Sequence, residues 1–149
     1  MSVPSPERKE STAEFLETAK QIEREALKLY GRPCYADIKE AIMTDIYRLS
    51  SRLTITLVRA NDIYTPNSRD RRTMELITVP KQQERLRLFV EAKGYLAALS
   101  SKITELYLIR PVKHRYRGQK KKLGILLGKE YDLLKGMIQS EETKLKKLK

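Results

Sequence analysis

The chain has 149 residues, of which 40% are hydrophobic and 34% are charged. Such a length fits one domain with a substantial core, and such a composition is typical of a folded chain rather than a disordered one. No apolar run approaches the ~18 residues of a membrane span, and the N-terminus has no apolar leader segment. The single cysteine, Cys34, excludes an internal disulfide. We therefore expect a cytoplasmic protein that does not contact a membrane.

Positive charge is concentrated in the later part of the chain. The net charge of the whole chain is +12. Residues 1–45 hold seven basic and nine acidic residues, a net charge of −2, whereas residues 46–149 hold twenty-four basic and ten acidic residues, a net charge of +14. Segregated positive charge favours a polyanionic partner such as RNA or DNA, because each neutralised phosphate releases counterions. The alternative is a basic protein without such a partner.

The N-terminal part predicts a short lead followed by a helix. Residues 1–10, with Pro4 and Pro6, are expected to form a disordered lead. The sequence Ser-Thr-Ala-Glu at 11–14 then fits a capping box, which marks a helix start. Apolar residues follow at a 4-3-4-3 spacing that makes one helical stripe: Phe15, Ala19, Ile22, Ala26 and Leu29. Gly31 and Pro33 predict the end of this helix.

A second helix is predicted from about Tyr35 to Tyr64. Its apolar stripe again has spacings of three and four: Ile38, Ile42, Ile46, Leu49, Leu53, Leu57, Ala60 and Tyr64. Within it, the β-branched residues of 53–58 (LTITLV) have local strand propensity, but the helical period continues on both sides and favours a helix. Pro66 and Asn67 break the pattern, and residues 68–78 fit either a short helix or an ordered loop.

Two further amphipathic helices complete the chain. The third begins near Pro80, a residue suited to a first helical turn, and ends at Pro111. Its inward residues are predicted to be Leu86, Phe89, Leu96, Leu99, Ile103 and Leu106. The fourth runs from about Gln119 to Leu148, with Leu123, Leu127, Leu134, Ile138, Leu145 and Leu148 inward. Four such helices predict an all-α, antiparallel up-down four-helix bundle that forms a single domain over residues 11–149.

Residues that perform catalysis or hold a metal are sparse. The chain has one histidine, His114, and one cysteine, far apart in sequence. No spacing of His, Cys or carboxylate residues matches a metal site, and no glycine-rich phosphate loop is present. We therefore expect no enzyme activity, no metal and no cofactor.

The connector between the third and fourth helices is the most basic segment. Residues 110–122 (RPVKHRYRGQKKK) contain seven Lys or Arg and no acid. Cations of this density are suited to phosphate, and a tyrosine among them is suited to stacking on an unpaired base. The candidate nucleic-acid-binding residues here are Arg110, Lys113, His114, Arg115, Tyr116, Arg117, Lys120, Lys121 and Lys122. The alternative is a solvated loop between helices.

Two other basic sets are candidates to extend this surface. Arg69, Arg71 and Arg72 lie just after the second helix, opposed only by Asp70. The second set lies within that helix at spacings of four and seven, which predicts one helical face: Arg48, Arg52 and Arg59. Such a face is equally typical of a solvated surface or of a surface for a partner helix.

Glycines inside the third and fourth helices predict close packing. Glycine costs about 0.5–1 kcal/mol relative to alanine in a helix interior. Gly124 and Gly128 share a face, and Gly94 is a similar case. We expect another helix or another subunit to approach there, which favours a homo-oligomer.

The last two helices resemble a known superfamily. Residues 89–109 read FVEAKGYLAALSSKITELYLI and residues 123–140 read LGILLGKEYDLLKGMIQS, with Gly136-Met137-Ile138 near the end. These patterns resemble four-helix-bundle proteins that include the accessory variability proteins of diversity-generating retroelements and proteins encoded by intervening sequences of bacterial ribosomal RNA genes. The resemblance covers roughly residues 35–140. Met137, where an aromatic residue is frequent, and the long 65–80 connection depart from the pattern.

The resemblance implies a function that composition alone does not. Such accessory proteins form homopentameric barrels, bind RNA and DNA, and associate with the reverse transcriptase of the retroelement. For this chain the first hypothesis is therefore a retroelement accessory factor that holds template RNA or cDNA near a reverse transcriptase. The alternatives are a DNA-mobilisation protein that assists a relaxase, and a helical protein–protein adaptor whose arginines meet an acidic partner.

Overall fold

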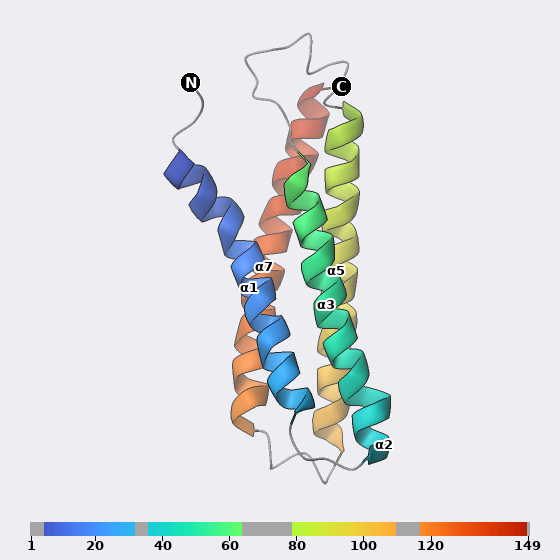
Figure 1. Cartoon of the computed structure of the whole chain (residues 1–149). Helices are drawn as coiled ribbons and strands as arrows, with labels where there is room; N and C mark the ends of the chain where they lie inside the picture. The colour runs from blue at the N-terminus through green and yellow to red at the C-terminus, as the bar shows by residue number, and fades with distance from the viewer. Residues whose placement is uncertain (1–4, 32–35, 64–78, 110–116, 149) are drawn as a thin grey trace.

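Every regular secondary-structure element in the described residues is a helix. The computed structural model describes residues 5–31, 36–63, 79–109 and 117–148. The elements are α1 (Ser5–Tyr30), α2 (Ala36–Ile38), the π-helical turn η1 (Lys39–Met43), α3 (Thr44–Asp62), α5 (Val79–Leu108) and α7 (Arg117–Leu148). The four long helices run alternately in opposite directions (Figure 1), and each packs on the next, with α7 closing the ring against α1. An all-α four-helix bundle is therefore confirmed within these residues.

The core lies along the bundle axis and uses the predicted stripes. All five predicted inward residues of α1 are buried, from Phe15 to Leu29. Phe15 meets Phe89 of α5 edge to face, with ring centroids 5.5 Å apart and an interplanar angle of 78°. Aromatic pairs favour this arrangement. The pair joins two helices that are not neighbours in the ring, so it ties the bundle across its centre.

Helix α1 begins earlier than the capping motif predicts. It starts at Ser5 rather than near Ser11, so part of the predicted lead is helical. Ser5-Pro6-Glu7 suits a helix start, because proline fits the first turn and an acid there complements the helix dipole. At the other end, the Gly31 N–H donates to the Leu27 carbonyl at 3.0 Å. Toward its N-terminus α1 leans away from the other three helices (Figure 1).

The predicted second helix is one helical run with a π turn near its start. The backbone N–H and the hydroxyl of Thr44 both donate to the Lys39 carbonyl, five residues earlier, the hydroxyl at 3.1 Å. Ile38, Ile42 and Ile46 follow one another at spacings of four, which drift around a regular α-helix. The extra residue in the π turn offsets this drift, so Ile42 and Ile46 are both buried. Residues 53–58, with their local strand propensity, are helical as predicted.

Several inward positions hold polar residues that the predicted apolar stripes did not include. Leu86 is only half-buried, and Arg85, next to it in sequence, is buried instead. In α7, Leu123, Leu127 and Leu134 are buried as predicted, but Glu130 and Glu141 are also fully buried. The interior of the bundle therefore includes ionisable side chains, namely Arg85, Glu130 and Glu141.

The helical glycines do not pack against the bundle. Gly94, Gly124 and Gly128 are exposed, and a Cβ added at each would meet nothing within 4 Å. The predicted approach by another helix of the same chain is therefore wrong. The approach of a second subunit stays a prediction.

Candidate nucleic-acid interface

Three consecutive lysines lie in the first turns of α7. Lys120, Lys121 and Lys122 are all exposed. The Lys122 ammonium lies 3.0 Å from Oε1 of Glu25 in α1. The Lys120 ammonium lies 5.2 Å from the centroid of the Tyr107 ring. Neither Lys120 nor Lys121 has a carboxylate oxygen within 4.0 Å among the described residues. These two cations are therefore available to an external anion.

Glu25 neutralises part of the positive charge at this end of the bundle. Its Oε1 accepts from Lys122 and, at 3.3 Å, from Lys28. Burial raises the pKa of the Glu25 carboxyl, but the hydrogen bonds and charges of Lys122 and Lys28 outweigh burial, and its pKa falls below the ordinary value. Glu25 is thus ionised at neutral pH. Lys122 is engaged within the fold, which leaves its two neighbours as the accessible pair.

The helix itself adds positive potential at these lysines. The N-terminus of a helix has a partial positive charge, so acidic side chains stabilise it and basic side chains do not. Helix α7 has no acid in its first turn and instead has a basic N-terminal segment. A phosphate group at this end would interact favourably with both the helix end and the ammonium groups. The local sequence therefore favours anion binding over helix stability.

The remaining residues of the basic connector lie outside the described residues. This applies to Arg110, Lys113, His114, Arg115 and Tyr116, and to the side chain of Arg117. The helix ends that flank this segment lie at the same end of the bundle as the last turn of α1 (Figure 1).

The other predicted loop set, Arg69, Arg71 and Arg72, also lies outside the described residues. The end of α3 and the start of α5, which flank it, lie at the opposite end of the bundle from the first turn of α7 (Figure 1). Helix α5 runs from one end to the other over 30 residues, which is about 45 Å at 1.5 Å per residue. The flanks of the two basic segments are thus separated by the length of the bundle.

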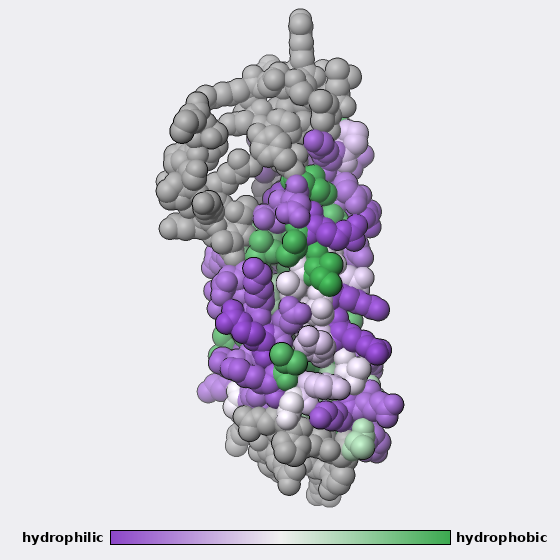
Figure 2. All heavy atoms as spheres, in the orientation of Figure 1, coloured by the Kyte–Doolittle hydropathy of each residue, from purple (hydrophilic) through white to green (hydrophobic). Residues whose placement is uncertain are grey.

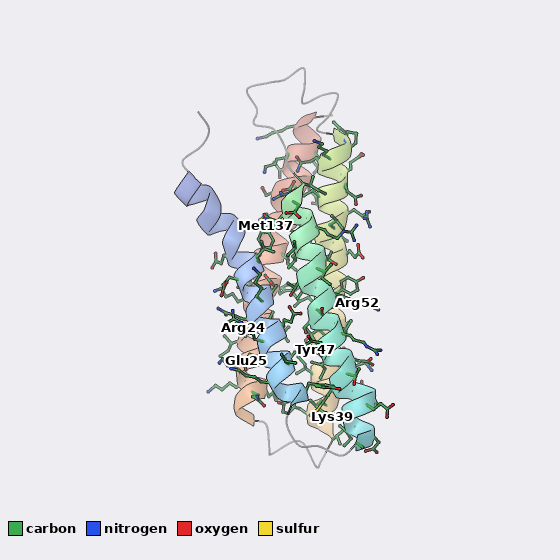
Figure 3. All side chains as sticks on the ribbon, viewed as in Figure 1. Arg24, Glu25, Lys39, Tyr47, Arg52 and Met137 are labelled. Atoms are coloured by element: carbon green, nitrogen blue, oxygen red, sulfur yellow. The ribbon has the colours of Figure 1, made fainter. Side chains whose placement is uncertain are left out.

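The arginines of α3 form an exposed stripe on a different helix. Arg48, Arg52 and Arg59 are all exposed. In Figure 3, Arg52 lies on the side of α3 away from α1, whereas Tyr47 lies toward α1, where its ring is 6.2 Å from that of Tyr30. Helices α3 and α7 lie across the bundle from each other (Figure 1). The stripe is therefore separate from the lysines of α7.

A buried ion pair at the other end of the bundle escaped prediction. Nε of Arg85 lies 2.8 Å from Oε1 of Glu141. Nη1 of Arg85 also donates to the carbonyl of Ile63 at 3.2 Å and to that of Ala60 at 3.5 Å. Arg85 thereby donates to two carbonyls at the C-terminus of α3, where backbone carbonyls run out of helical partners; that of Ala60 also accepts the Ile63 N–H at 3.2 Å. The sequence did contain one sign that Arg85 and Glu141 are buried, because both continue the apolar stripes of their helices at spacings of three and four.

Glu130 is a second buried acid of α7, and the part of the chain that the structure describes offers it no partner. Its side chain is 0% exposed, and neither carboxyl oxygen has a hydrogen-bond partner among the described residues. Burial raises the pKa of this carboxyl to about 8 and outweighs the charge of Lys129, which lowers it. Glu130 is therefore mainly protonated at neutral pH, which lowers the cost of burying it.

Within the described residues no three His, Cys, Asp or Glu side chains are grouped so as to hold a metal ion. None of the described helices has the length and apolarity needed to cross a bilayer. On the front face of Figure 2, hydrophilic residues dominate and apolar residues form small patches among them.

Comparison with known proteins leaves the resemblance of the last two helices as a prediction. The chain matches no protein-family model, no curated protein and no solved structure at a significant level.

Proposed function

We propose that this protein is a non-catalytic accessory protein that binds RNA or DNA through the basic N-terminal end of α7. The supporting observation is the exposed pair Lys120 and Lys121, which has no neighbouring carboxylate among the described residues and lies at the positive end of a long helix. The net charge of +14 over residues 46–149 adds long-range attraction for a polyanion.

The contacts of such a site are mainly to phosphate. Lysine is a compact point charge with no preferred planar partner, so it binds phosphate without reading base edges. The bound nucleic acid is therefore held with little sequence preference. Affinity depends strongly on salt concentration, because binding releases counterions.

The partner enzyme in this proposal comes from the resemblance. The basic bundle associates with a reverse transcriptase of a diversity-generating retroelement and holds template RNA or cDNA beside it. The second candidate, a relaxase accessory protein, uses the same basic surface. A neighbouring gene for a reverse transcriptase with variable repeats supports the first, and a neighbouring relaxase gene supports the second.

A salt titration tests nucleic-acid binding directly. Fluorescence anisotropy of a labelled single-stranded RNA and of a DNA of the same sequence is measured with the full chain at increasing salt. Each phosphate contact to a single strand contributes about 0.7 to the slope of log affinity against log salt. We expect binding in dilute buffer and a steep loss toward physiological salt. Absence of binding to both probes in dilute buffer contradicts the proposal.

A matched pair of variants locates the site. Lys120→Gln with Lys121→Gln removes two cations from the first turns of α7, and Lys146→Gln with Lys147→Gln removes two from its last turn. We expect the first variant to lower the salt slope by about 1.4 and the second to leave it nearly unchanged. Equal effects would mean that net charge alone, and no localised site, attracts the nucleic acid.

We further propose that the protein forms a homo-oligomer through the outer faces of α5 and α7. Gly94, Gly124 and Gly128 are exposed there, and Ile125 and Tyr131 are 64% and 45% exposed. Glycines without packing inside the bundle fit close approach by a second subunit, and the resemblance implies a pentamer. Light scattering of the purified chain measures the mass, and a monomer at micromolar concentration contradicts this assembly.

A further inference from the structure

The exposed stripe of α3 includes an apolar residue among its arginines. Ile55, which is 56% exposed, lies on the same face of α3 as Arg48, Arg52 and Arg59. The four positions have spacings of four, three and four, so they lie on one face of the helix over three turns. None of the three arginines has a carboxylate within 4.0 Å among the described residues. We name these four residues the α3 stripe.

Helix α5 runs beside the α3 stripe and contributes carboxylates and an aromatic ring. The Lys102 ammonium of α5 lies 3.7 Å from Oδ2 of Asp45, which precedes the stripe. At the other end, Arg59 is close enough to Glu84 to contribute to the lowered pKa of that carboxyl, after the larger effect of Arg87. Between these contacts the same side of α5 has Glu91 and Tyr95, whose hydroxyl donates to Glu91 at 3.1 Å.

This composition differs from that of a surface for a polyanion. The carboxylates nearest the stripe are paired with other cations, Glu84 and Glu91 with Arg87 and Asp45 with Lys102. The exposed side chain of Ile55 in the middle of the stripe gains nothing from a phosphate backbone, whereas the lysines of α7 include no apolar neighbour in their consecutive run 120–122. Exposed arginine together with an aromatic and an aliphatic side chain is characteristic of protein–protein interfaces. Mixed charges there set register and exclude wrong partners. The face of α3 and α5 is therefore better suited to a protein than to a nucleic acid.

We propose that the α3 stripe is a docking site for an acidic amphipathic helix of a partner protein. Three arginines at fixed helical spacing match three carboxylates on one face of a second helix, and Ile55 packs against an apolar residue between them. Arg59 lies 11 positions after Arg48, which is a rise of about 17 Å along the helix. Charge complementarity selects the occupant, and Ile55 supplies apolar area that a purely electrostatic contact lacks. This site goes beyond the proposed nucleic-acid binding and is separate from it on the fold.

A synthetic helix tests the proposal with the full chain. The probe is a fluorescein-labelled peptide of about 16 residues with Glu at positions i, i+4 and i+11 and Leu at i+7 of one face, stabilised by i,i+4 pairs on the other. A peptide of the same composition in scrambled order is the control. We expect anisotropy to show binding of the patterned peptide at least about tenfold tighter than binding of the scrambled one.

Two variants separate this site from the nucleic-acid site. Arg48→Glu with Arg52→Glu is expected to weaken peptide binding more than tenfold, and Ile55→Asp, which changes one apolar contact, about tenfold. Both are expected to leave the affinity for single-stranded RNA within about twofold. Lys146→Glu with Lys147→Glu is the matched charge control and is expected to leave peptide affinity within twofold. Circular dichroism at 222 nm verifies that each variant remains helical.

The outcomes distinguish the two proposals. Equal affinity for patterned and scrambled peptides, or an Ile55→Asp chain that binds the patterned peptide like the parent, overturns the docking site. An RNA affinity that falls as far for the Arg48/Arg52 variant as for the Lys120/Lys121 variant also overturns it, because the stripe then belongs to the nucleic-acid surface. Failure of the parent chain to bind any nucleic acid refutes the proposed function and leaves the peptide result to be judged alone.

Discussion

Replacing Glu130 with glutamine tests the most unusual group of the core. In the folded protein, burial raises the pKa of Glu130 to about 8, whereas in the unfolded chain it returns to its ordinary value of about 4.3. Between these values the folded state holds a proton that the unfolded state releases. Stability therefore falls as pH rises through this window, by up to about 1.4 kcal/mol per pH unit. Below the window and above it, Glu130 contributes no further change.

Glutamine has nearly the same shape and no ionisation, so Glu130→Gln removes this dependence. We expect the variant and the parent to be similarly stable near pH 4.5. By pH 8 the accumulated difference in the free energy of unfolding approaches about 5 kcal/mol in favour of the variant, as an upper limit. Relaxation of the bundle around an ionised carboxylate reduces that value, so a difference of 2 kcal/mol or more is the expected result.

Urea unfolding followed by circular dichroism at pH 4.5, 6, 7 and 8.5 measures the difference. Glu142→Gln is the matched control, since Glu142 is exposed on the same helix and its replacement removes the same charge. Subtracting the parent from each variant cancels the pH dependence of the other titrating groups. Parallel curves for the parent and Glu130→Gln across this range would show that Glu130 is not desolvated, and the reasoning would be refuted.

Three other substitutions have defined outcomes. Arg85→Ala removes the donor to the Ile63 carbonyl and leaves the buried carboxylate of Glu141 with only the Lys144 ammonium at 4.0 Å, so we expect a loss of about 3–5 kcal/mol in urea unfolding. Phe89→Ala removes the edge-to-face partner of Phe15 and is expected to cost about 3–5 kcal/mol, measured the same way. Lys120→Glu with Lys121→Glu is expected to raise the melting temperature slightly, because acids suit a helix N-terminus. The same variant is expected to weaken RNA binding. A lower melting temperature together with weaker binding, or an unchanged affinity for RNA, contradicts the assigned site.

The helical framework was predictable because its apolar residues repeat at helical spacing. The stripe from Phe15 to Leu29 and the buried leucines of α7 follow from that period alone. Even residues 53–58 were predictable as helix despite their β-branched side chains, because the period extends beyond them.

The polar interior was not predictable by the same rule. Arg85, Glu130 and Glu141 lie at inward positions, but the pattern treats a charged residue as a surface residue. Their burial depends on the residues that surround them in three dimensions, such as the carbonyls of α3 that Arg85 reaches.

The candidate site was predictable in part. Exposure of Lys120 and Lys121 follows from their position outside the leucine stripe. The engagement of Lys122 by Glu25, which is distant in sequence, required the packing of α1 against α7. The carboxylates of α5 near the arginines of α3 likewise belong to another helix, so the sequence pattern of α3 alone did not predict them.

The hydrogen bonds from Arg85 to the carbonyls of Ile63 and Ala60 affect how this chain tolerates insertions. The end of α3 is fastened to α5 by a side chain, independently of the residues that connect the two helices. Lengthening a connection costs little, because loop-closure entropy grows only with the logarithm of its length. Insertions between Ile63 and Val79 should therefore be accepted without loosening the helices, which makes that stretch a natural place to graft a tag or for relatives to diverge.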